Sequence, residues 1–348
     1  MLERHLRVPY VLVLASTLAL SSCRSLKVTV LGANARKPSN VAFYVTIERS
    51  EEPVPGLGAD RFAIYEDGAR LSPADTKLTM IDPSLVVGRY TLILLDLSAK
   101  VVESDRLGDI AAGATKLVER TLKTDKVAVG AFDGSAQLHV ITHFADKQPT
   151  IGASLEKIPT FKPSDPSSNL HGGVVEGLRA LDKALSADAR QFKVGTLIVF
   201  VGGPDRAGRV SWAQMREAVD AAHKKGIHVF ALGAGPAVAD VQLEQIGKTF
   251  TVREKASGIG RAFELSGARA SLLAQRHYVL SYCTPARAGK HSVRIDVRDD
   301  KGTTGSFSYR FDADGFGPNC DPGLPPDFEP ELEPIKGETP KPKPEKKP

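Results

Sequence analysis

The chain has 348 residues, of which 46 are Lys or Arg and 41 are Asp or Glu, so its formal net charge is +5. This length allows one large domain with a smaller companion. Charge is spread along the chain apart from a basic C-terminal end, and no arginine-rich stretch is interleaved with aromatic residues. Nucleic acid is therefore excluded from the expected partners.

Residues 1–22 have the pattern of a bacterial lipoprotein signal peptide. Arg4 and Arg7 precede an apolar stretch over residues 8–20, which is too short to span a bilayer. Leu20-Ser-Ser-Cys23 matches the lipobox, in which the Cys is lipidated and becomes the new N-terminus. An ordinary secretion signal with a chance Cys, or a non-cleaved anchor, are the alternatives. We favour lipidation at Cys23, which predicts a protein of the bacterial cell envelope, lipid-anchored to the inner or the outer membrane.

Short β-like runs separated by turn residues occupy residues 26–88. Residues 41–47 and 61–65 are strand candidates, and the second is followed by Glu66-Asp67-Gly68. Asp-Gly after an alternating run is a strong hairpin signal. We expect an N-terminal β-domain here.

Residues 89–281 alternate buried strands with amphipathic helices. The run Tyr90-Thr-Leu-Ile-Leu-Leu95 is almost continuously apolar, as in a strand buried on both faces of a parallel sheet. Further core strands are expected at residues 126–132, 195–201 and 227–232. This alternation predicts an α/β fold, with a doubly wound, mainly parallel sheet and helices on both faces.

Residues 282–321 contain two more strand candidates, at 291–297 and 306–311, around a turn at 299–302. No helix separates them, so we expect them to pair with the N-terminal strands in one β-sandwich built from both ends of the chain. Residues 322–348 are rich in Pro and Lys, and we expect a disordered tail.

The chain has three cysteines. With Cys23 as the lipid site, Cys283 and Cys320 remain as a possible disulfide in an oxidising compartment. Two separate buried thiols are the alternative. We favour the disulfide, because Cys320 follows a Gly/Pro-rich stretch that cannot build a core of its own.

Asp96-Leu97-Ser98 follows the apolar strand directly, at the edge where parallel sheets bind ligands. An Asp followed two residues later by a Ser at this place resembles the first metal-binding loop of a von Willebrand factor type A domain, which reads Asp-x-Ser-x-Ser. Residues 53–68 also resemble a segment found upstream of such domains in many bacterial proteins. The resemblance implies the type A fold over residues 89–281. It also implies protein recognition at the top face of the sheet, often through Mg²⁺ or Mn²⁺.

The resemblance further implies five metal-ligand positions in three loops. Asp96 and Ser98 match the first two, and Ser168 stands at a position that is usually Thr. Lys100 replaces the second Ser of the first loop, and Gly202 replaces the Asp of the third loop. Two positions are thus lost.

These replacements argue against a functional metal, so neither Mg²⁺ nor Mn²⁺ is expected as a cofactor. Asp96, Ser98, Ser168 and Asp205 remain the candidate ligands, and Asp205 completes the site only if its loop rearranges. The sharper hypothesis places the Lys100 ammonium where the ion would lie, with Asp96, Ser98 and Ser168 as acceptors. The alternative is that Lys100 points to solvent.

The sequence lacks a zinc-type HExxH motif and a Gly-x-Ser-x-Gly elbow, so we do not expect an enzyme or a small-molecule substrate. We predict a non-catalytic module that binds another envelope or extracellular protein through the loops around Asp96, Lys100, Ser168 and Gly202. A mainly structural envelope protein that uses the fold as a scaffold is one alternative. A metal-dependent adhesin, if Asp205 completes the site, is the other.

Overall fold

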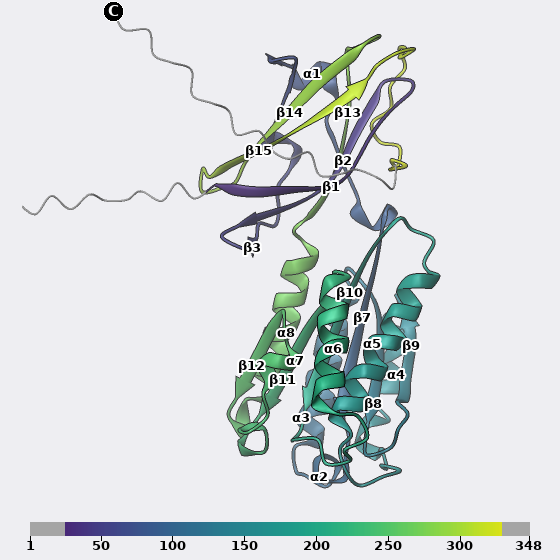
Figure 1. Cartoon of the computed structure of the whole chain (residues 1–348), viewed down its shortest axis with the longest axis vertical. Helices are drawn as coiled ribbons and strands as arrows, with labels where there is room; N and C mark the ends of the chain where they lie inside the picture. The colour runs from purple at the N-terminus through teal and green to yellow at the C-terminus, as the bar shows by residue number, and fades with distance from the viewer. Residues whose placement is uncertain (1–24, 329–348) are drawn as a thin grey trace, which may run out of the picture.

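A computed structural model describes residues 25–328 of the chain (Figure 1). The predicted signal peptide and Cys23 lie outside the described residues, as do residues 329–348 of the predicted tail. The molecule has two parts stacked along its long axis, an α/β part and a part made of antiparallel sheets (Figure 1).

A six-stranded sheet in the order β12-β11-β10-β7-β8-β9 forms the centre of the α/β part. All neighbouring strands are parallel except β9, which pairs antiparallel with β8. The strands are β7 (Val87–Asp96), β8 (Lys126–Phe132), β9 (His139–Ala145), β10 (Phe192–Val201), β11 (His228–Ala234) and β12 (Phe250–Glu254).

Helices cover both faces of this sheet, which is why β7 is buried at all ten positions. Ile93 and Leu95 point into one core, whereas Leu92 and Leu94 point into the other. The first core is closed by α3 (Leu107–Thr121), α4 (Gln148–Leu155) and α8 (Ile259–Ala274). The second is closed by α5 (Leu170–Ala187), α6 (Trp212–Lys224) and α7 (Leu243–Ile246). The predicted doubly wound α/β fold is confirmed.

Side-chain caps set where two of these helices begin. The Asn169 side chain accepts a hydrogen bond from the Gly172 N–H (3.2 Å) at the start of α5. At α6, Ser211 and Gln214 form a reciprocal capping box. These caps fix the loops in front of both helices, and both loops lie at the carboxyl edge of the sheet.

Two antiparallel sheets form the other part of the molecule. One has the order β1-β2-β13-β6 with β3 beside β2, and the second has the order β15-β14-β4-β5. The first contains β1 (Leu26–Arg36), β2 (Asn40–Arg49), β3 (Glu52–Pro53), β6 (Thr79–Ile81) and β13 (His277–Cys283). The second contains β4 (Phe62–Glu66), β5 (Ala69–Arg70), β14 (Lys290–Arg298) and β15 (Thr304–Asp312). The short helix α1 (Pro73–Thr76) lies between β5 and β6.

One apolar core joins the two antiparallel sheets. Phe43 of β2 packs edge-on against Phe307 of β15, with ring centroids 5.0 Å apart, and Leu280 of β13 lies in the same cluster as Ile295 of β14. The expected β-sandwich built from N- and C-terminal segments is confirmed.

Strand β13 requires a correction to the expected boundary. The sequence interpretation placed residues 277–281 at the end of the α/β block, but β13 pairs antiparallel with β2, from His277 opposite Thr46 to Cys283 opposite Asn40. All seven β13 residues are buried. An apolar sequence that predicts burial on both faces therefore does not distinguish a strand of the sandwich from a strand of the parallel sheet.

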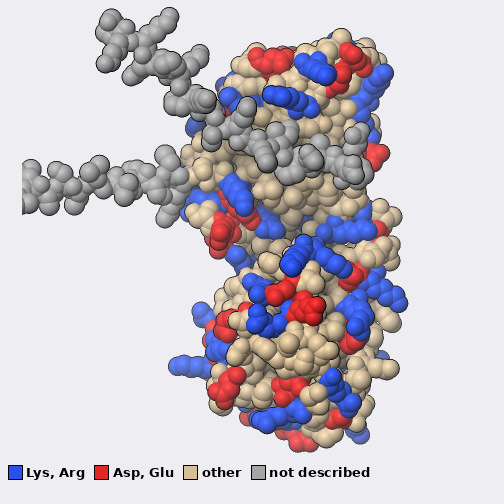
Figure 2. All heavy atoms as spheres, viewed as in Figure 1, with Lys and Arg blue, Asp and Glu red and all other residues tan. Residues whose placement is uncertain are grey.

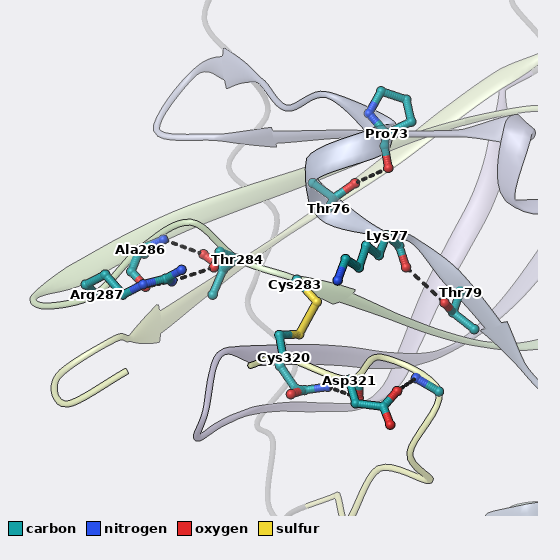
Figure 3. Close-up of a disulfide and its surroundings, with 12 residues drawn as sticks. Pro73, Thr76, Lys77, Thr79, Cys283, Thr284, Ala286, Arg287, Cys320 and Asp321 are labelled. Atoms are coloured by element: carbon teal, nitrogen blue, oxygen red, sulfur yellow. Dashed lines mark hydrogen bonds between the residues drawn. A yellow bond between two sulfur atoms is a disulfide. The ribbon is translucent and has the colours of Figure 1, made fainter. Parts of the chain in front are cut away.

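The predicted disulfide is confirmed. Cys283, the last residue of β13, is bonded to Cys320 after β15, with 5.7 Å between the Cα atoms (Figure 3). Beside it, the Asn40 side chain donates to the Asp321 carbonyl (2.5 Å). Both contacts hold the segment after β15 against the first sheet.

The expected disordered tail is corrected over its described part, residues 322–328. Phe328 is 3% exposed and packs edge-on against Phe192, with ring centroids 5.5 Å apart. Arg36 donates to the Pro325 carbonyl (2.9 Å). One aromatic side chain gives this proline-rich segment enough apolar surface to pack onto the body. Within residues 25–328, no helix is both long and apolar enough to cross a membrane.

Candidate functional site

Asp96 ends β7 and lies at the centre of the predicted site. Its side chain is fully buried. Oδ1 accepts the Ser98 N–H (3.0 Å), and Oδ2 accepts the Ser168 hydroxyl (3.1 Å) and the Gly202 N–H (3.2 Å). The first and second loops and the loop after β10 therefore meet at one carboxylate, as the sequence analysis expected of these four residues.

Burial raises the pKa of the Asp96 carboxyl, because a buried charge loses its hydration. Hydrogen bonds from Ser98, Ser168 and Gly202 oppose this rise without cancelling it. Each carboxylate oxygen already accepts at least one of these bonds. The protein itself therefore fills acceptor positions that a bound cation would need.

Gly202 shows how closely the loops are packed over Asp96. A Cβ atom at this position would lie 2.3 Å from Cγ2 of Val101 and 3.1 Å from Oδ2 of Asp96. Val101 is only 6% exposed, so it has little room to move. A side chain at the place where the family resemblance implies an acidic ligand therefore fits only if Val101 moves.

Lys100 lies in the short helix α2 (Ala99–Val102), which begins at Ser98. Its side chain is exposed, and it makes no hydrogen bond or ion pair with any residue between 25 and 328. This corrects the hypothesis that its ammonium takes the place of the ion. The helical turn directs Val101 toward Gly202 and leaves Lys100 on the solvent side, which is the alternative stated above.

Asp205 is held away from this group by the start of α5. Its Oδ2 accepts the His171 N–H (2.9 Å) and its Oδ1 accepts the Gly208 N–H (2.8 Å). Among the described residues, Asp205 makes no hydrogen bond to the Asp96 group. A carboxylate at a helix N-terminus is stabilised by the helix dipole, so this position has a structural explanation.

The Asp96 site offers one carboxylate and two hydroxyls, whereas the family resemblance implies five metal-ligand positions that include a second acid. The residues therefore do not reproduce the full ligand set of the family. Within the part of the chain that the structure describes, no group of three or more His, Cys, Asp or Glu residues is arranged to hold a metal ion.

Comparison with known proteins found similar solved structures but no match in sequence. No family model and no curated protein matches the chain. A von Willebrand factor type A protein from Catenulispora acidiphila has a TM-score of 0.43 at 13% identity, over 86% of this chain and 75% of that chain. The BatB protein of Bacteroides thetaiotaomicron has a TM-score of 0.41 at 19% identity, over 54% of this chain and 99% of its own.

The manganese-loaded TRAP protein of Plasmodium vivax gives a TM-score of 0.44 at 10% identity, over 74% of this chain and all of its own length. The chain is similar to von Willebrand factor type A structures. At these identities and scores the similarity concerns the fold alone.

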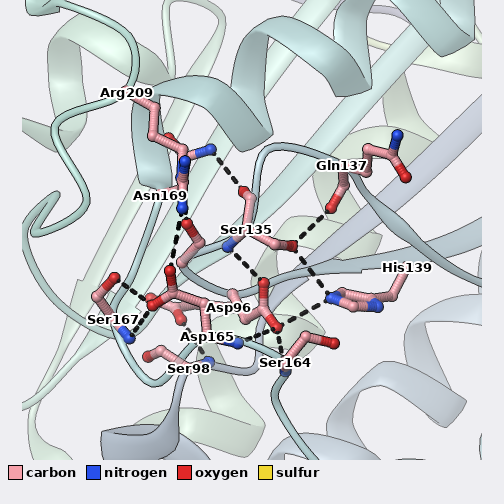
Figure 4. Close-up of polar contacts among 12 residues, drawn as sticks. Asp96, Ser98, Ser135, Gln137, His139, Ser164, Asp165, Ser167, Asn169 and Arg209 are labelled. Carbon is pink, nitrogen blue, oxygen red and sulfur yellow. Dashed lines mark hydrogen bonds and ion pairs between the residues drawn. The ribbon is translucent and has the colours of Figure 1, made fainter.

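A second buried carboxylate lies beside the Asp96 site in this type A-like sheet. Asp133 follows β8 directly, its side chain is fully buried, and its Oδ1 accepts the Ser135 N–H (2.7 Å). Its Oδ2 accepts the N–H groups of Ser164 (2.6 Å) and Asp165 (3.2 Å) and lies 3.0 Å from Nε2 of His139 (Figure 4). The sequence analysis did not select Asp133.

Burial alone would raise the pKa of Asp133, but its hydrogen bonds outweigh this effect and lower the pKa to about 2. The bonds come from the side chain and backbone of Ser135 and from the backbone of Asp165 and Ser164. The rule that selected Asp96, an acidic residue at the carboxyl end of a core strand, would also have selected Asp133.

Asp133, His139 and Ser135 do not form a catalytic triad. Nε2 of His139 lies 3.0 Å from Asp133 Oδ2 and 3.5 Å from Ser135 Oγ, so one ring nitrogen faces both groups. A relay needs the acid on one nitrogen and the hydroxyl on the other. The cluster therefore orders the loops and does not activate Ser135.

Around this cluster, Arg209 joins the loop after β10 to the loops beside Asp133. Its Nε donates to the Gly134 carbonyl (2.5 Å) and its Nη2 lies 3.1 Å from Asp165 Oδ2 (Figure 4). Asp165 in turn accepts from the backbone N–H (3.0 Å) and hydroxyl (2.7 Å) of Ser167, next to Ser168. The two carboxylate groups thus share one set of ordered loops.

Proposed function

We propose that the chain is a lipid-anchored protein of the bacterial envelope that binds another protein, without catalysis and without a divalent metal. Its contacts lie on the loops at the carboxyl edge of the parallel sheet. The observation that carries this proposal is the closed Asp96 site. The carboxylate accepts one hydrogen bond from each of Ser98, Ser168 and Gly202, and Val101 fills the space beside Gly202.

The position of Lys100 supports a metal-free contact. Its ammonium is exposed, and Asp96 does not compete for it in this structure. A partner carboxylate can therefore pair with Lys100 directly. An exposed ion pair contributes only about 0.2–1 kcal/mol, so most of the affinity must come from the wider loop surface. On the face shown in Figure 2, basic and acidic side chains are mixed, and the surface is not dominated by one charge.

Lipid anchoring rests on the match of Leu20-Ser-Ser-Cys23 to a lipobox. The test is mass spectrometry of the N-terminal peptide from the membrane fraction, with Cys23→Ala as the comparison. We expect an acylated Cys23 in the native protein and loss of the processed form in the variant. An unmodified Cys23 in a chain that still carries residues 1–22 contradicts the anchor.

Metal independence is tested by isothermal titration of the chain with Mg²⁺, Mn²⁺ and Ca²⁺. We expect no uptake at concentrations up to the millimolar range. Uptake that is abolished by Asp96→Ala contradicts the proposal and makes metal-dependent adhesion the leading function.

The binding surface is tested with a photo-crosslinking amino acid at position 100 in cells, with position 116 as the matched control. Lys116 is also an exposed lysine, but it lies on α3. We expect a discrete crosslinked protein from position 100 only, and a weaker crosslink after Arg209→Ala, which loosens the same loops. Equal or absent crosslinking at both positions favours the mainly structural alternative.

A further inference from the structure

The start of the described chain lies against the second antiparallel sheet. Ser25 and Leu26 line a groove of about 880 Å³ together with residues of β4, β14 and β15. The contact with β15 is close, since a Cβ on Gly305 would lie 2.4 Å from the Leu26 carbonyl oxygen. The polypeptide therefore leaves toward residue 23 from the surface of this sheet.

The outward face of this sheet is polar and basic. On β14, Val293, Ile295 and Val297 are buried in the sandwich core, so the alternate residues Arg294, Asp296 and Arg298 face outward. Opposite them in the register stand Ser308, Ser306 and Thr304 of β15. Strand β4 adds Ala63 and Tyr65 to this face, beside Asp296 and Arg294. Charged and hydroxyl side chains therefore predominate over a small apolar part.

Two arginines in the groove have no internal partner. Arg70 and Arg298 line it, and neither guanidinium group makes a hydrogen bond or ion pair with any residue in the described range 25–328. By contrast, Arg61 pairs with Asp300 (2.5 Å) and Arg294 pairs with Asp296 (3.0 Å) while lying 4.3 Å from the centre of the Tyr65 ring. The groove therefore offers unused guanidinium groups to an external anion.

Chain length brings this groove close to the proposed lipid anchor. Cys23 precedes Ser25 by two residues, so their Cα atoms are at most about 7 Å apart. This distance is shorter than the Debye length of about 10 Å at 0.1 M salt. Charges in the groove are then within reach of lipid headgroups and are only partly screened.

We infer that the outward face of sheet β15-β14-β4-β5 docks on anionic phospholipid headgroups, with Arg70 and Arg298 as the main contacts. The inference rests on the proposed lipidation of Cys23 for its biological setting. Docking also orients the molecule. The sandwich lies at one end of the long axis, and α2 with the loops of the candidate site lies at the other (Figure 1). The binding loops then lie at the end of the molecule that is distant from the docked sandwich.

The test uses the chain from residue 24 onward, tethered by an N-terminal histidine tag to nickel-chelating lipid in vesicles. This tether replaces the acyl chains, so the result is independent of whether Cys23 is lipidated. Because Cys283 and Cys320 are paired, a single introduced thiol can be labelled with a fluorophore. Ser306→Cys places the label in the groove, and Lys162→Cys places it on a loop at the far end. Quenching by a nitroxide lipid reports proximity to the bilayer.

We expect strong quenching at position 306 and little at position 162 in vesicles that contain phosphatidylglycerol. Quenching should be weak at both positions when phosphatidylcholine replaces the phosphatidylglycerol and the other lipids are unchanged. Arg70→Glu combined with Arg298→Glu should lower the ratio of docked to undocked protein at least about tenfold. Lys116→Glu combined with Lys183→Glu is the matched control, since both lysines are exposed on helices of the α/β part. Unfolding midpoints of all variants confirm that they are folded.

Equal quenching at positions 306 and 162, or quenching that ignores phosphatidylglycerol or the arginine substitutions, overturns the inference. Quenching at position 306 that disappears with a soluble anionic polysaccharide but not with salt of equal ionic strength assigns the face to a polysaccharide, and also overturns it. Failure of acylation at Cys23 would refute the anchor alone, because the tagged tether measures docking separately.

Discussion

Asp96 and Asp133 occupy equivalent places on neighbouring strands, and their pKa values move in opposite directions. Both side chains are fully buried at the carboxyl ends of β7 and β8. Asp96 accepts two backbone N–H groups at 3.0 and 3.2 Å and one hydroxyl. Asp133 accepts three backbone N–H groups, two of them at 2.7 Å or less, and faces an imidazole.

The difference shows that burial alone does not decide the charge of a carboxyl, because lost hydration and hydrogen-bond donors act in opposite directions. At Asp133 the donors outweigh the lost hydration, whereas at Asp96 the lost hydration is larger than the donors offset. Asp133 is therefore an anion that organises the loops. Asp96 is the weaker acid of the two, and it occupies the position where the family resemblance implies a metal ligand.

Asp133→Asn should give the largest effect, lowering the free energy of unfolding by about 3 kcal/mol at pH 7. The amide nitrogen of Asn would face at least one of the N–H donors that the carboxylate now accepts. Urea denaturation measures the change. Asp105→Asn is the control, because the Asp105 side chain is 96% exposed, and it should change stability by less than about 0.5 kcal/mol. A loss below about 1 kcal/mol for Asp133→Asn would contradict the role of the donors.

The opposite pKa shifts of Asp133 and Asp96 should also be visible in the pH dependence of unfolding. The folded-state pKa of Asp133, about 2, is below the ordinary Asp value of 3.8. Its stabilisation is therefore present above about pH 4 and is lost as the pH falls toward 2, amounting to about 2 kcal/mol. Asp96 has the opposite sign, since its raised pKa makes the folded state bind a proton more readily. Between pH 5 and 2, the free energy of unfolding should fall less steeply with pH in Asp133→Asn than in the native protein. Identical slopes of free energy against pH would refute this assignment.

Gly202→Ala should destabilise the fold by about 1–3 kcal/mol through overpacking, because its Cβ would lie 2.3 Å from Val101 Cγ2. Val101→Ala should recover part of this loss in the double variant, which a double-mutant cycle measures. Gly208→Ala is a useful contrast. Gly208 has a positive φ of +61° and nothing within 4 Å, so any loss there reflects backbone strain and not packing. Strict additivity of the substitutions at positions 101 and 202 would show that the loops are not packed as described.

Asp96→Asn should have the smallest effect, about 1 kcal/mol or less. A neutral Asn does not carry the free-energy cost of burying a charge, which is the effect that raises the pKa of Asp96. This gain offsets the loss of one good hydrogen-bond acceptor. The comparison with Asp133→Asn tests the difference between the two carboxyls directly, since the substitution is chemically identical at two buried sites. If Asp96→Asn is as damaging as Asp133→Asn, the two carboxyls do not differ as proposed.

The sequence predicts the fold well because its signals are local and strong. Continuous apolar runs identify β7 and β10 as core strands, and Ser211 marks the start of α6. The place of β13 is not predicted by such local signals. Its partners β2 and β6 lie about two hundred residues or more away in the chain, and it is buried on both faces like a strand of the parallel sheet.

The sequence predicts which residues meet at the site but not how their side chains pack. The resemblance to a type A metal site implies that Asp96, Ser98, Ser168 and Gly202 lie together, and in the structure they do. That Val101 and not Lys100 faces Gly202 depends on the turn of α2, which four residues of sequence do not specify. Asp133 was missed because the Asp-Gly that it begins is also an ordinary turn signal.

The pairing of β6 with β13 has a consequence for how the chain is assembled. Ile81 and Val279 are register partners, so the polypeptide enters and leaves the α/β part through neighbouring strands of one sheet. The α/β part is in effect an insertion into a sandwich, with its two ends already side by side. A chain that emerges N-terminus first cannot complete the sandwich until the whole insertion has followed. The sandwich and its Cys283–Cys320 bond must therefore form last, around an α/β part that is free to fold first.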